Sequence, residues 1–204
     1  RETDLNDRQR QYVRLIDSSA RSLLNVINEI LDFSKLSSGK MELETVAFDL
    51  TSLLQERIAT LEGGAGAACC SSGHAAQIMA LFPLMGPGLN VVVSTRLYGG
   101  SITQFSQTIR RFGWSATFVD FDDTDAVAAA IDDDTRAVFC ESIANPGGYV
   151  TDLPAIAAIA DAAGIPLIVD NTSATPYLCR PIEHGATLVV HSTTKYMTGN
   201  GTVT

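Results

Sequence analysis

The chain has 204 residues, of which 46% are hydrophobic and 18% are charged, and its formal net charge is -9. These values fit one or two soluble globular domains. We expect no binding to nucleic acid or to anionic membranes, because both need a basic surface. No apolar run approaches the roughly 18 residues that a membrane-spanning helix needs, so no such helix is expected.

The cysteines indicate the redox environment of the protein. The four cysteines show no C-x-x-C spacing, and three of them lie in apolar runs, where a free cysteine behaves as a small hydrophobe. The pattern indicates a reducing, cytoplasmic setting without disulfides. No metal site is expected, because the three histidines show no ligand spacing. The sequence begins with arginine instead of methionine and ends without a polar tail, which we interpret as a fragment. The cysteines are Cys69, Cys70, Cys140 and Cys179.

The first forty residues have a helical pattern. Asn6, with Gln9 three residues later, resembles a capping arrangement, and Gly39 is a candidate for the helix stop. Apolar residues recur in alternating steps of three and four, as in a coiled-coil seam. Because a lone helix buries such a stripe poorly, the helix should either pack on its own domain or dimerise. The seam consists of Val13, Ile16, Ala20, Leu23, Ile27 and Ile30, widened by Leu24 and Leu31.

The pattern changes at about Glu56, where short β-rich apolar runs begin to alternate with helical stretches. This alternation predicts an α/β domain with a mostly parallel sheet. In such sheets, functional residues gather beyond the carboxyl ends of the strands. Strands are expected at 90–94, 116–119, 137–141, 166–170 and 187–191, and helices at about 101–112, 124–131 and 153–163.

Three strand-end or helix-start positions carry possible chemistry. Asp170 directly follows an apolar strand, although the cap of a turn is the simpler interpretation of this residue alone. Lys195 follows another strand and three hydroxyl residues. It is either a buried, neutral nucleophile or a lysine that points to water. Gly73 lies at a helix start, where backbone N–H groups either bind an anion or are simply capped.

Together these positions offer an acid, an amine and a phosphate cradle at one edge of the sheet. Pyridoxal 5'-phosphate (PLP) needs these groups, together with an aromatic face, for which Tyr98 is a candidate.

Seven motifs follow one another in the second part of the chain. They are Leu61-Glu62-Gly63-Gly64, Ser72-Gly73-His74-Ala75-Ala76, Tyr98-Gly99-Gly100-Ser101, Glu141-Ser142-Ile143-Ala144-Asn145-Pro146, Val169-Asp170-Asn171-Thr172, the stretch from Pro176 to Ala186, and His191-Ser192-Thr193-Thr194-Lys195.

In this order, the motifs resemble those of the Cys/Met-metabolism PLP enzymes of fold type I, over about residues 56–204. The subgroup with the most similar pattern is O-acetylhomoserine sulfhydrylase. The resemblance implies a truncated large domain with a mostly parallel sheet, and a homo-oligomer. It also implies γ-replacement in methionine biosynthesis, in which sulfide replaces the acetate of O-acetylhomoserine to give homocysteine.

The resemblance also implies a role for each site residue. Lys195 would bind the cofactor as a Schiff base, and Asp170 would pair with the pyridine nitrogen. Tyr98 would stack on the ring, and Asn145 would lie near its phenolic oxygen. The phosphate would be held by Ser72, Gly73, His74, Ser192 and Thr194.

The sequence departs from the family pattern in several places. Ser173 stands where the family usually has Phe, and Thr198 and Asn200 replace the usual Gly and His. The family's N-terminal Tyr and Arg, which reach the neighbouring subunit, have no counterpart here. The C-terminal domain with the arginine that binds the substrate carboxylate has none either.

Residues 1–54 resemble the dimerisation helices of hybrid sensor histidine kinases. The resemblance rests on the run Ile30-Leu31-Asp32-Phe33-Ser34-Lys35 and on the later Phe48-Asp49-Leu50. No histidine precedes His74, and no ATP-binding domain follows. We therefore expect a helical segment at 1–54 and a truncated PLP domain at 55–204. The alternatives are a helical signalling module that carries an inactive PLP fragment, and an artificial join.

Overall fold

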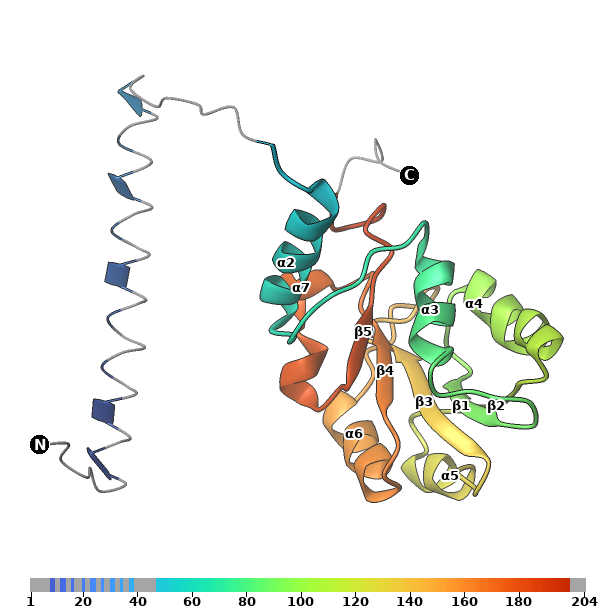
Figure 1. Cartoon of the computed structure of the whole chain (residues 1–204). Coiled ribbons are helices and arrows are strands. Elements are labelled where there is room, and N and C mark those ends of the chain that lie inside the picture. Colours follow the sequence, from blue (N-terminus) through green and yellow to red (C-terminus); the bar gives the residue numbers. More distant parts are fainter. Residues whose placement is uncertain are drawn as a thin grey trace, which may run out of the picture. The chain divides into compact units, whose positions relative to one another are not determined.

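A computed structural model of the chain describes residues 47–198 and, before them, residues 8–9, 12–13, 16, 20, 23–24, 27, 30–31, 34 and 37–38. The chain forms two compact units, residues 1–48 and residues 49–204 (Figure 1). Among the described residues, no helix is both long and apolar enough to cross a membrane.

The first unit is helical at its described positions from residue 8 to residue 37, as the sequence predicts. Along this helix the large apolar side chains of the predicted seam are between 42% and 67% exposed. Dimerisation through this stripe stays a prediction. The exposed apolar residues of the seam are Val13, Ile16, Leu23, Leu24, Ile27, Ile30 and Leu31.

The second unit is built on a five-stranded sheet in which every paired neighbour is parallel, in the order β2-β1-β3-β4-β5. This confirms the predicted α/β class, and each strand begins and ends within two residues of its predicted bounds. The strands are β1 (Asn90–Ser94), β2 (Ser115–Val119), β3 (Thr135–Glu141), β4 (Leu167–Asp170) and β5 (Leu188–Val190).

Helices connect and cover the strands. The stretch predicted as one helix at 101–112 is a succession of a short α-helix, a π-helix and a 3₁₀-helix, which ends at Gly113 in the left-handed region. The helical elements are α2 (Leu50–Glu62), α3 (Gly73–Leu81), α4 (Gly99–Thr103), η1 (Gln104–Thr108), η2 (Ile109–Phe112), α5 (Thr124–Ala129), α6 (Leu153–Ala162), α7 (Thr175–Leu178) and η3 (Pro181–His184).

Helix α2 is an element that the strand-and-helix pattern did not reveal. Asp49 is its N-cap and accepts hydrogen bonds from the Thr51 amide (3.0 Å) and the Ser52 hydroxyl (2.6 Å). Gly63 ends it in the left-handed conformation, at φ 72°. The helix therefore runs without interruption across residues 54 and 55, where the sequence analysis placed a domain boundary.

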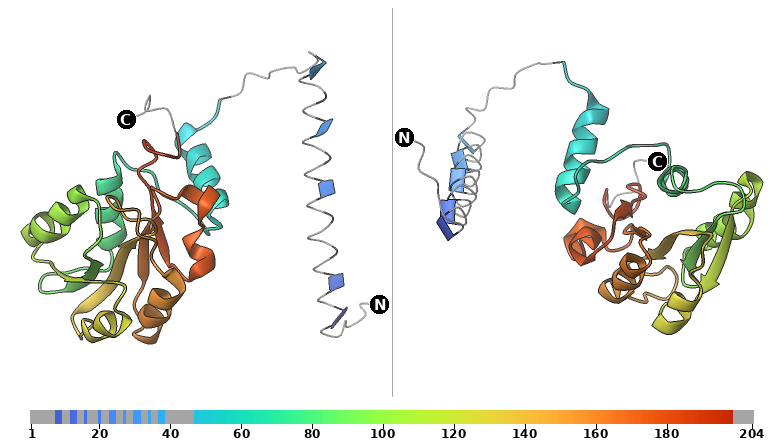
Figure 2. Two further views of the ribbon diagram at one scale, coloured as in Figure 1. Left: turned by 180° about the vertical axis from the view of Figure 1, so that it is seen from behind. Right: turned by 60° about the horizontal axis from the view of Figure 1, so that its bottom comes forward.

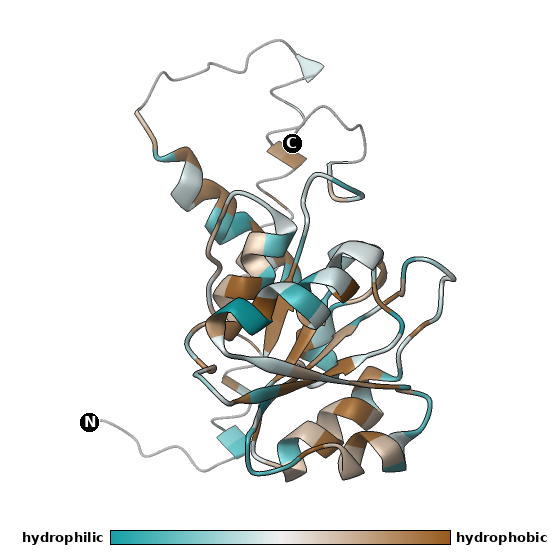
Figure 3. Cartoon of the chain, turned by 90° about the vertical axis from the view of Figure 1, so that its right-hand side faces the viewer, coloured by the Kyte–Doolittle hydropathy of each residue, from teal (hydrophilic) through white to brown (hydrophobic). Residues whose placement is uncertain are grey.

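The sheet separates two hydrophobic cores, because successive side chains of a strand point to opposite faces. Val91 and Val93 pack on one face with Phe105, whereas Val92 packs on the other with Ile156. Helices α3 and α4 cover the first face, and α5 and α6 cover the second (Figure 2). Figure 3 shows the strands as a hydrophobic layer between these helices.

Replacing Phe139 with alanine tests this packing. Phe139 is fully buried on β3, and its ring centroid lies 4.6 Å from that of Phe105. We expect Phe139→Ala to lower the free energy of unfolding by about 3–5 kcal/mol, because it leaves a cavity in the core. Phe82→Ala is the control, since Phe82 is 63% exposed. If urea unfolding showed the same decrease in the free energy of unfolding for both variants, this arrangement of the core would be contradicted.

Candidate functional site

The predicted site residues meet at the edge of the sheet where the strands end. Tyr98 follows β1, Asp170 is the last residue of β4, and residues 191–195 follow β5. Glu141, the last residue of β3, lies directly beside Asp170 in the strand register. The strand order reverses between β1 and β3, which is where open parallel sheets bind their ligands.

Asp170 is held in a fixed orientation. It is 8% exposed, and its Oδ1 accepts a hydrogen bond from the Thr172 amide (3.0 Å). Its Oδ2 accepts one from the Gln77 side-chain amide on α3 (3.0 Å). Gln77 is itself held by Gln104, whose amide donates to Gln77 Oε1 (2.9 Å). The result is an oriented acidic group at the rim, tied to the helix that begins at Gly73.

The start of α3 lies against the segment that follows β5. A Cβ atom added to Gly73 would lie 2.8 Å from Ser192 Cβ, which is closer than real Cβ contacts allow. Glycine at this position therefore permits the approach of the helix to Ser192. Ser72, the N-cap, accepts a hydrogen bond from the Ala75 amide (3.2 Å). The structure thus brings together Ser72, Gly73 and Ser192 at the positive end of a nine-residue helix, an arrangement suited to a phosphate.

An aromatic pair lies beside this helix start. The rings of Tyr98 and His74 stack with their centroids 6.0 Å apart and their planes at 25°. A Cβ at Gly100 would lie 2.7 Å from both rings, so a side chain there would disturb the pair. Tyr98 is 49% exposed, which leaves part of its ring free for a flat ligand.

Glu141 joins two segments of the site and is not among the site residues that the sequence predicts. It is 5% exposed, and its carboxylate accepts hydrogen bonds from the backbone amides of Tyr98 (2.7 Å) and Asn145 (3.0 Å). Burial raises the pKa of this carboxyl to about 7, the two amide hydrogen bonds oppose the rise, and the nearby Asp170 carboxylate adds to it. A glutamate directly after the apolar run 137–140 is the sequence signal for this residue.

Lys195 lies in the turn at residues 193–198, after β5. Its backbone amide donates to the Ser192 carbonyl (3.1 Å), but the residue is exposed. The buried alternative for this lysine is therefore not observed. Of the residues that depart from the family pattern, Thr198 donates to the Thr194 carbonyl (3.3 Å), which supports the same turn, and Asn200 lies outside the described residues.

A second buried polar group, also missed from the sequence, fixes α2 to the sheet. Glu62, the last residue of α2, pairs with the imidazole of His191 and accepts a hydrogen bond from the Asn171 side-chain amide (2.9 Å). Asn171 in turn accepts a hydrogen bond from the Ser142 hydroxyl (2.7 Å). This network ties α2, β3, β4 and the end of β5 together just before the turn that carries Lys195.

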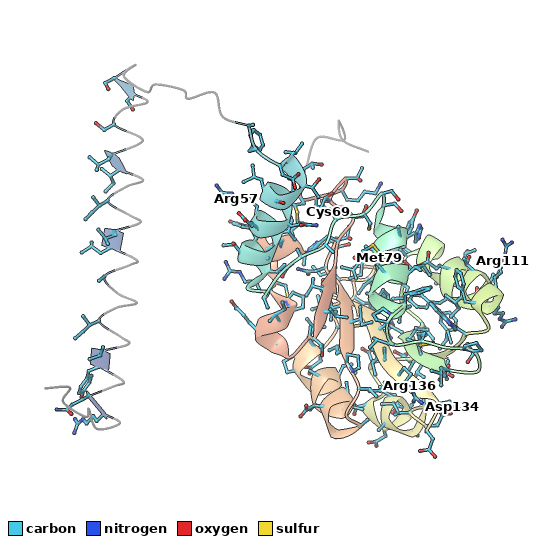
Figure 4. All side chains as sticks on the ribbon, in the orientation of Figure 1. Arg57, Cys69, Met79, Arg111, Asp134 and Arg136 are labelled. Atoms are coloured by element: carbon cyan, nitrogen blue, oxygen red, sulfur yellow. The ribbon has the colours of Figure 1, made fainter. Side chains whose placement is uncertain are left out.

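A cavity of about 540 Å³ lies beside this network, between α2, α3, β5 and the loop that joins the two helices. Figure 4 labels two of its lining residues, Cys69 on the loop and Met79 on α3. The cavity shares Ser72, Gly73 and Thr194 with the candidate site. The cavity is not lined by Asp170, Tyr98 or Lys195. It therefore adjoins the rim of the sheet but does not include these predicted site residues.

The pKa of Glu141 predicts a pH dependence of stability. Its folded value of about 7 lies above the ordinary value of 4.5, so the folded state binds the proton more tightly. The stabilisation from this proton is complete below pH 4.5 and is lost as the pH rises through 7. We expect the melting temperature to fall less over this window in Glu141→Gln than in the unchanged protein. Parallel pH curves in thermal unfolding would contradict this.

The Glu62–His191 pair predicts a difference between two histidine substitutions. His191→Leu removes a buried partner of Glu62, so it should lower the free energy of unfolding by about 1–3 kcal/mol. His184→Leu, at an exposed position, is the matched control and should leave it nearly unchanged. A comparable loss in both variants by urea unfolding would show that the pair does not anchor α2.

The chain is similar to known proteins. The chain is 50% identical over 151 residues to Sulfhydrylase FUB7 of Fusarium oxysporum, covering 74% of this chain and 35% of that protein. It is 48% identical over 149 residues to O-acetyl-L-homoserine sulfhydrylase of Corynebacterium glutamicum, covering 72% of this chain and 34% of that one. The chain therefore spans about a third of the length of these relatives.

A solved structure has the same fold. It is a putative O-acetylhomoserine (thiol)-lyase from Campylobacter jejuni that carries a pyridoxyl-lysine monophosphate residue. The TM-score is 0.73 at 42% identity, covering 74% of this chain and 37% of that one.

Two family descriptions match the two parts of the sequence. Residues 1–39 match the His Kinase A (phospho-acceptor) domain, which agrees with the predicted resemblance of the first helix, although the first histidine of the chain is His74. Residues 46–204, more than three quarters of the chain, match the family described as Cys/Met metabolism PLP-dependent enzyme. The chain therefore belongs to the PLP-dependent enzymes of Cys/Met metabolism.

Proposed function

We propose that residues 55–204 form the PLP-binding part of an enzyme that catalyses γ-replacement on O-acetylhomoserine. Sulfide would enter as acetate leaves, and the product would be homocysteine. The observation that carries the proposal is the close approach of Gly73 to Ser192 beside the oriented Asp170 carboxylate. The names of the similar sulfhydrylases support the choice of substrate.

The residues at the rim fit the cofactor. The helix start at Gly73 meets Ser192. A phosphate would be held there with Ser72, His74 and Thr194. The Asp170 carboxylate would hold a proton on the pyridine nitrogen. Tyr98 would stack on the ring with its half-exposed face. Asn145, an exposed residue, would bind the phenolic oxygen.

When bound, PLP supplies an electron sink for the negative charge that develops on an amino-acid substrate. Lys195 would hold the cofactor's aldehyde carbon through Nζ and would move a proton on the substrate once displaced. Its position in an exposed turn gives the amine access to both. The carboxylate of Asp170 would keep the pyridine proton in place while Lys195 acts.

The same proposal includes assembly and location. We infer a homo-oligomer, because α7 exposes large apolar side chains: Tyr177 is 92% exposed and Leu178 is 68% exposed. A second copy would cover such surface. We infer a cytoplasmic location, because the four cysteines are free and thiols stay reduced in that compartment.

A PLP titration of the purified chain tests the proposed function. Lys195 is the only lysine after Lys40, so a visible absorbance band that borohydride abolishes should require Lys195. We expect the band in the unchanged protein and in Lys40→Ala, and its loss in Lys195→Ala. Lys40→Ala is the matched control, since it removes an amine outside the proposed site.

Two results would contradict the proposed function. One is a folded protein, by circular dichroism, that develops no band. The other is a band of equal strength in Lys195→Ala. If the band forms, release of homocysteine from O-acetylhomoserine and sulfide is the assay for the reaction itself.

A further inference from the structure

Glu141 occupies a junction between two segments that are far apart in the sequence. One is the segment that links β1 to α4 and carries Tyr98, and the other is the loop after β3 that carries Asn145. Each carboxylate oxygen accepts one backbone amide, Oε1 from Tyr98 at 2.7 Å and Oε2 from Asn145 at 3.0 Å. Among the described hydrogen bonds, these two backbone amides donate only to the Glu141 side chain.

Both segments lie at the surface at the residues that contact Glu141. Tyr98 is 49% exposed and Asn145 is exposed. The loop after β3 is closed on itself by the isolated bridge between Ile143 and Val150. The guanidinium of Arg96 lies 4.2 Å from the centre of the Tyr149 ring, which brings the same two segments together at the surface. Glu141 is the buried connection between them.

The residue type matters here. An ionised carboxylate has two acceptor oxygens and can satisfy both amides, whereas a glutamine amide has one acceptor and would leave one N–H group without a partner. Burying a carboxylate beside another acid is costly, and Asp170 is its direct neighbour in the strand register. The hydrogen bonds from both amides offset part of that cost. An apolar side chain, or one with a single acceptor, would have a lower free-energy cost of burial at this position. The carboxylate is favoured where both segments must be fixed.

We propose that Glu141 is a positioning residue of the cofactor site, whose carboxylate fixes Tyr98 and Asn145 relative to Asp170. This inference rests on the proposed function. It goes beyond that function because it assigns the placement of the two residues that would contact the ring to a third side chain, Glu141.

Amide hydrogen exchange of the cofactor-free chain tests the connection directly. Above pH 7, where the Glu141 carboxyl is ionised, Glu141→Gln should raise exchange at least roughly tenfold in peptides covering 96–100 and 143–149, because a hydrogen bond to a charged group is lost. Glu141→Ala should raise it further in the same two peptides. Glu183→Gln, an exposed carboxylate paired with Arg180, is the control and should leave both unchanged.

The dissociation constant of PLP, measured by absorbance, tests the role in the site. We expect the dissociation constant to rise roughly tenfold in Glu141→Gln, which keeps one acceptor oxygen. We expect a larger rise in Glu141→Ala, which keeps none. The glutamine variant is the partial rescue. If Glu141 merely stabilised the fold, its replacement would raise amide exchange throughout the domain. The dissociation constants of the two variants would then not follow the number of acceptors that remain.

The outcomes separate the two proposals. If the unchanged protein binds no PLP, the proposed function is wrong and the positioning role falls with it. If it binds PLP, and the Glu141 variants bind it equally well or exchange their amides at the original rates, the positioning role alone is overturned.

Discussion

The parallel register of the sheet is the constraint on which the candidate site depends. In a parallel sheet every strand ends at the same edge, so residues that lie far apart in the sequence become neighbours there. Glu141 and Asp170 are direct register partners, although 28 residues separate them. The strands form because runs such as Val91–Val93 are buried on both faces, with helices covering each side. The gathering of polar side chains at the rim is therefore a consequence of hydrophobic burial below it.

Polar connections then fix what the sheet brings together. Gln77 on α3 holds Asp170, and the bare backbone of Gly73 lets the same helix approach Ser192. Glu62 on α2 pairs with His191, three residues before Thr194. Buried polar groups of this kind stabilise only when they are bonded, so each one specifies a relative position of two elements.

The sequence predicted the sheet and most of the rim, because these depend on local signals. Apolar runs mark the strands, Asp170 stands at the end of one of them, and Gly73 stands at the start of a helix. Helix α2 is not predicted, because its N-cap Asp49 lies in the run Phe48-Asp49-Leu50, which carries the resemblance to the histidine kinases. Glu141 and Glu62 were missed for a different reason. Their partners lie 43 and 129 residues away, and neither burial nor such pairing is visible before the fold is known. The exposure of Lys195 likewise depends on what surrounds the turn.

The most direct test of a PLP site at this rim is to map where the cofactor attaches. The chain has three lysines, Lys35, Lys40 and Lys195, so reduction with borohydride followed by peptide mass spectrometry has few possible outcomes. A site at the carboxyl edge of the sheet predicts one pyridoxyl group per chain, on the peptide that contains Lys195. Modification spread over Lys35 and Lys40, or no modification of a folded chain, would contradict it.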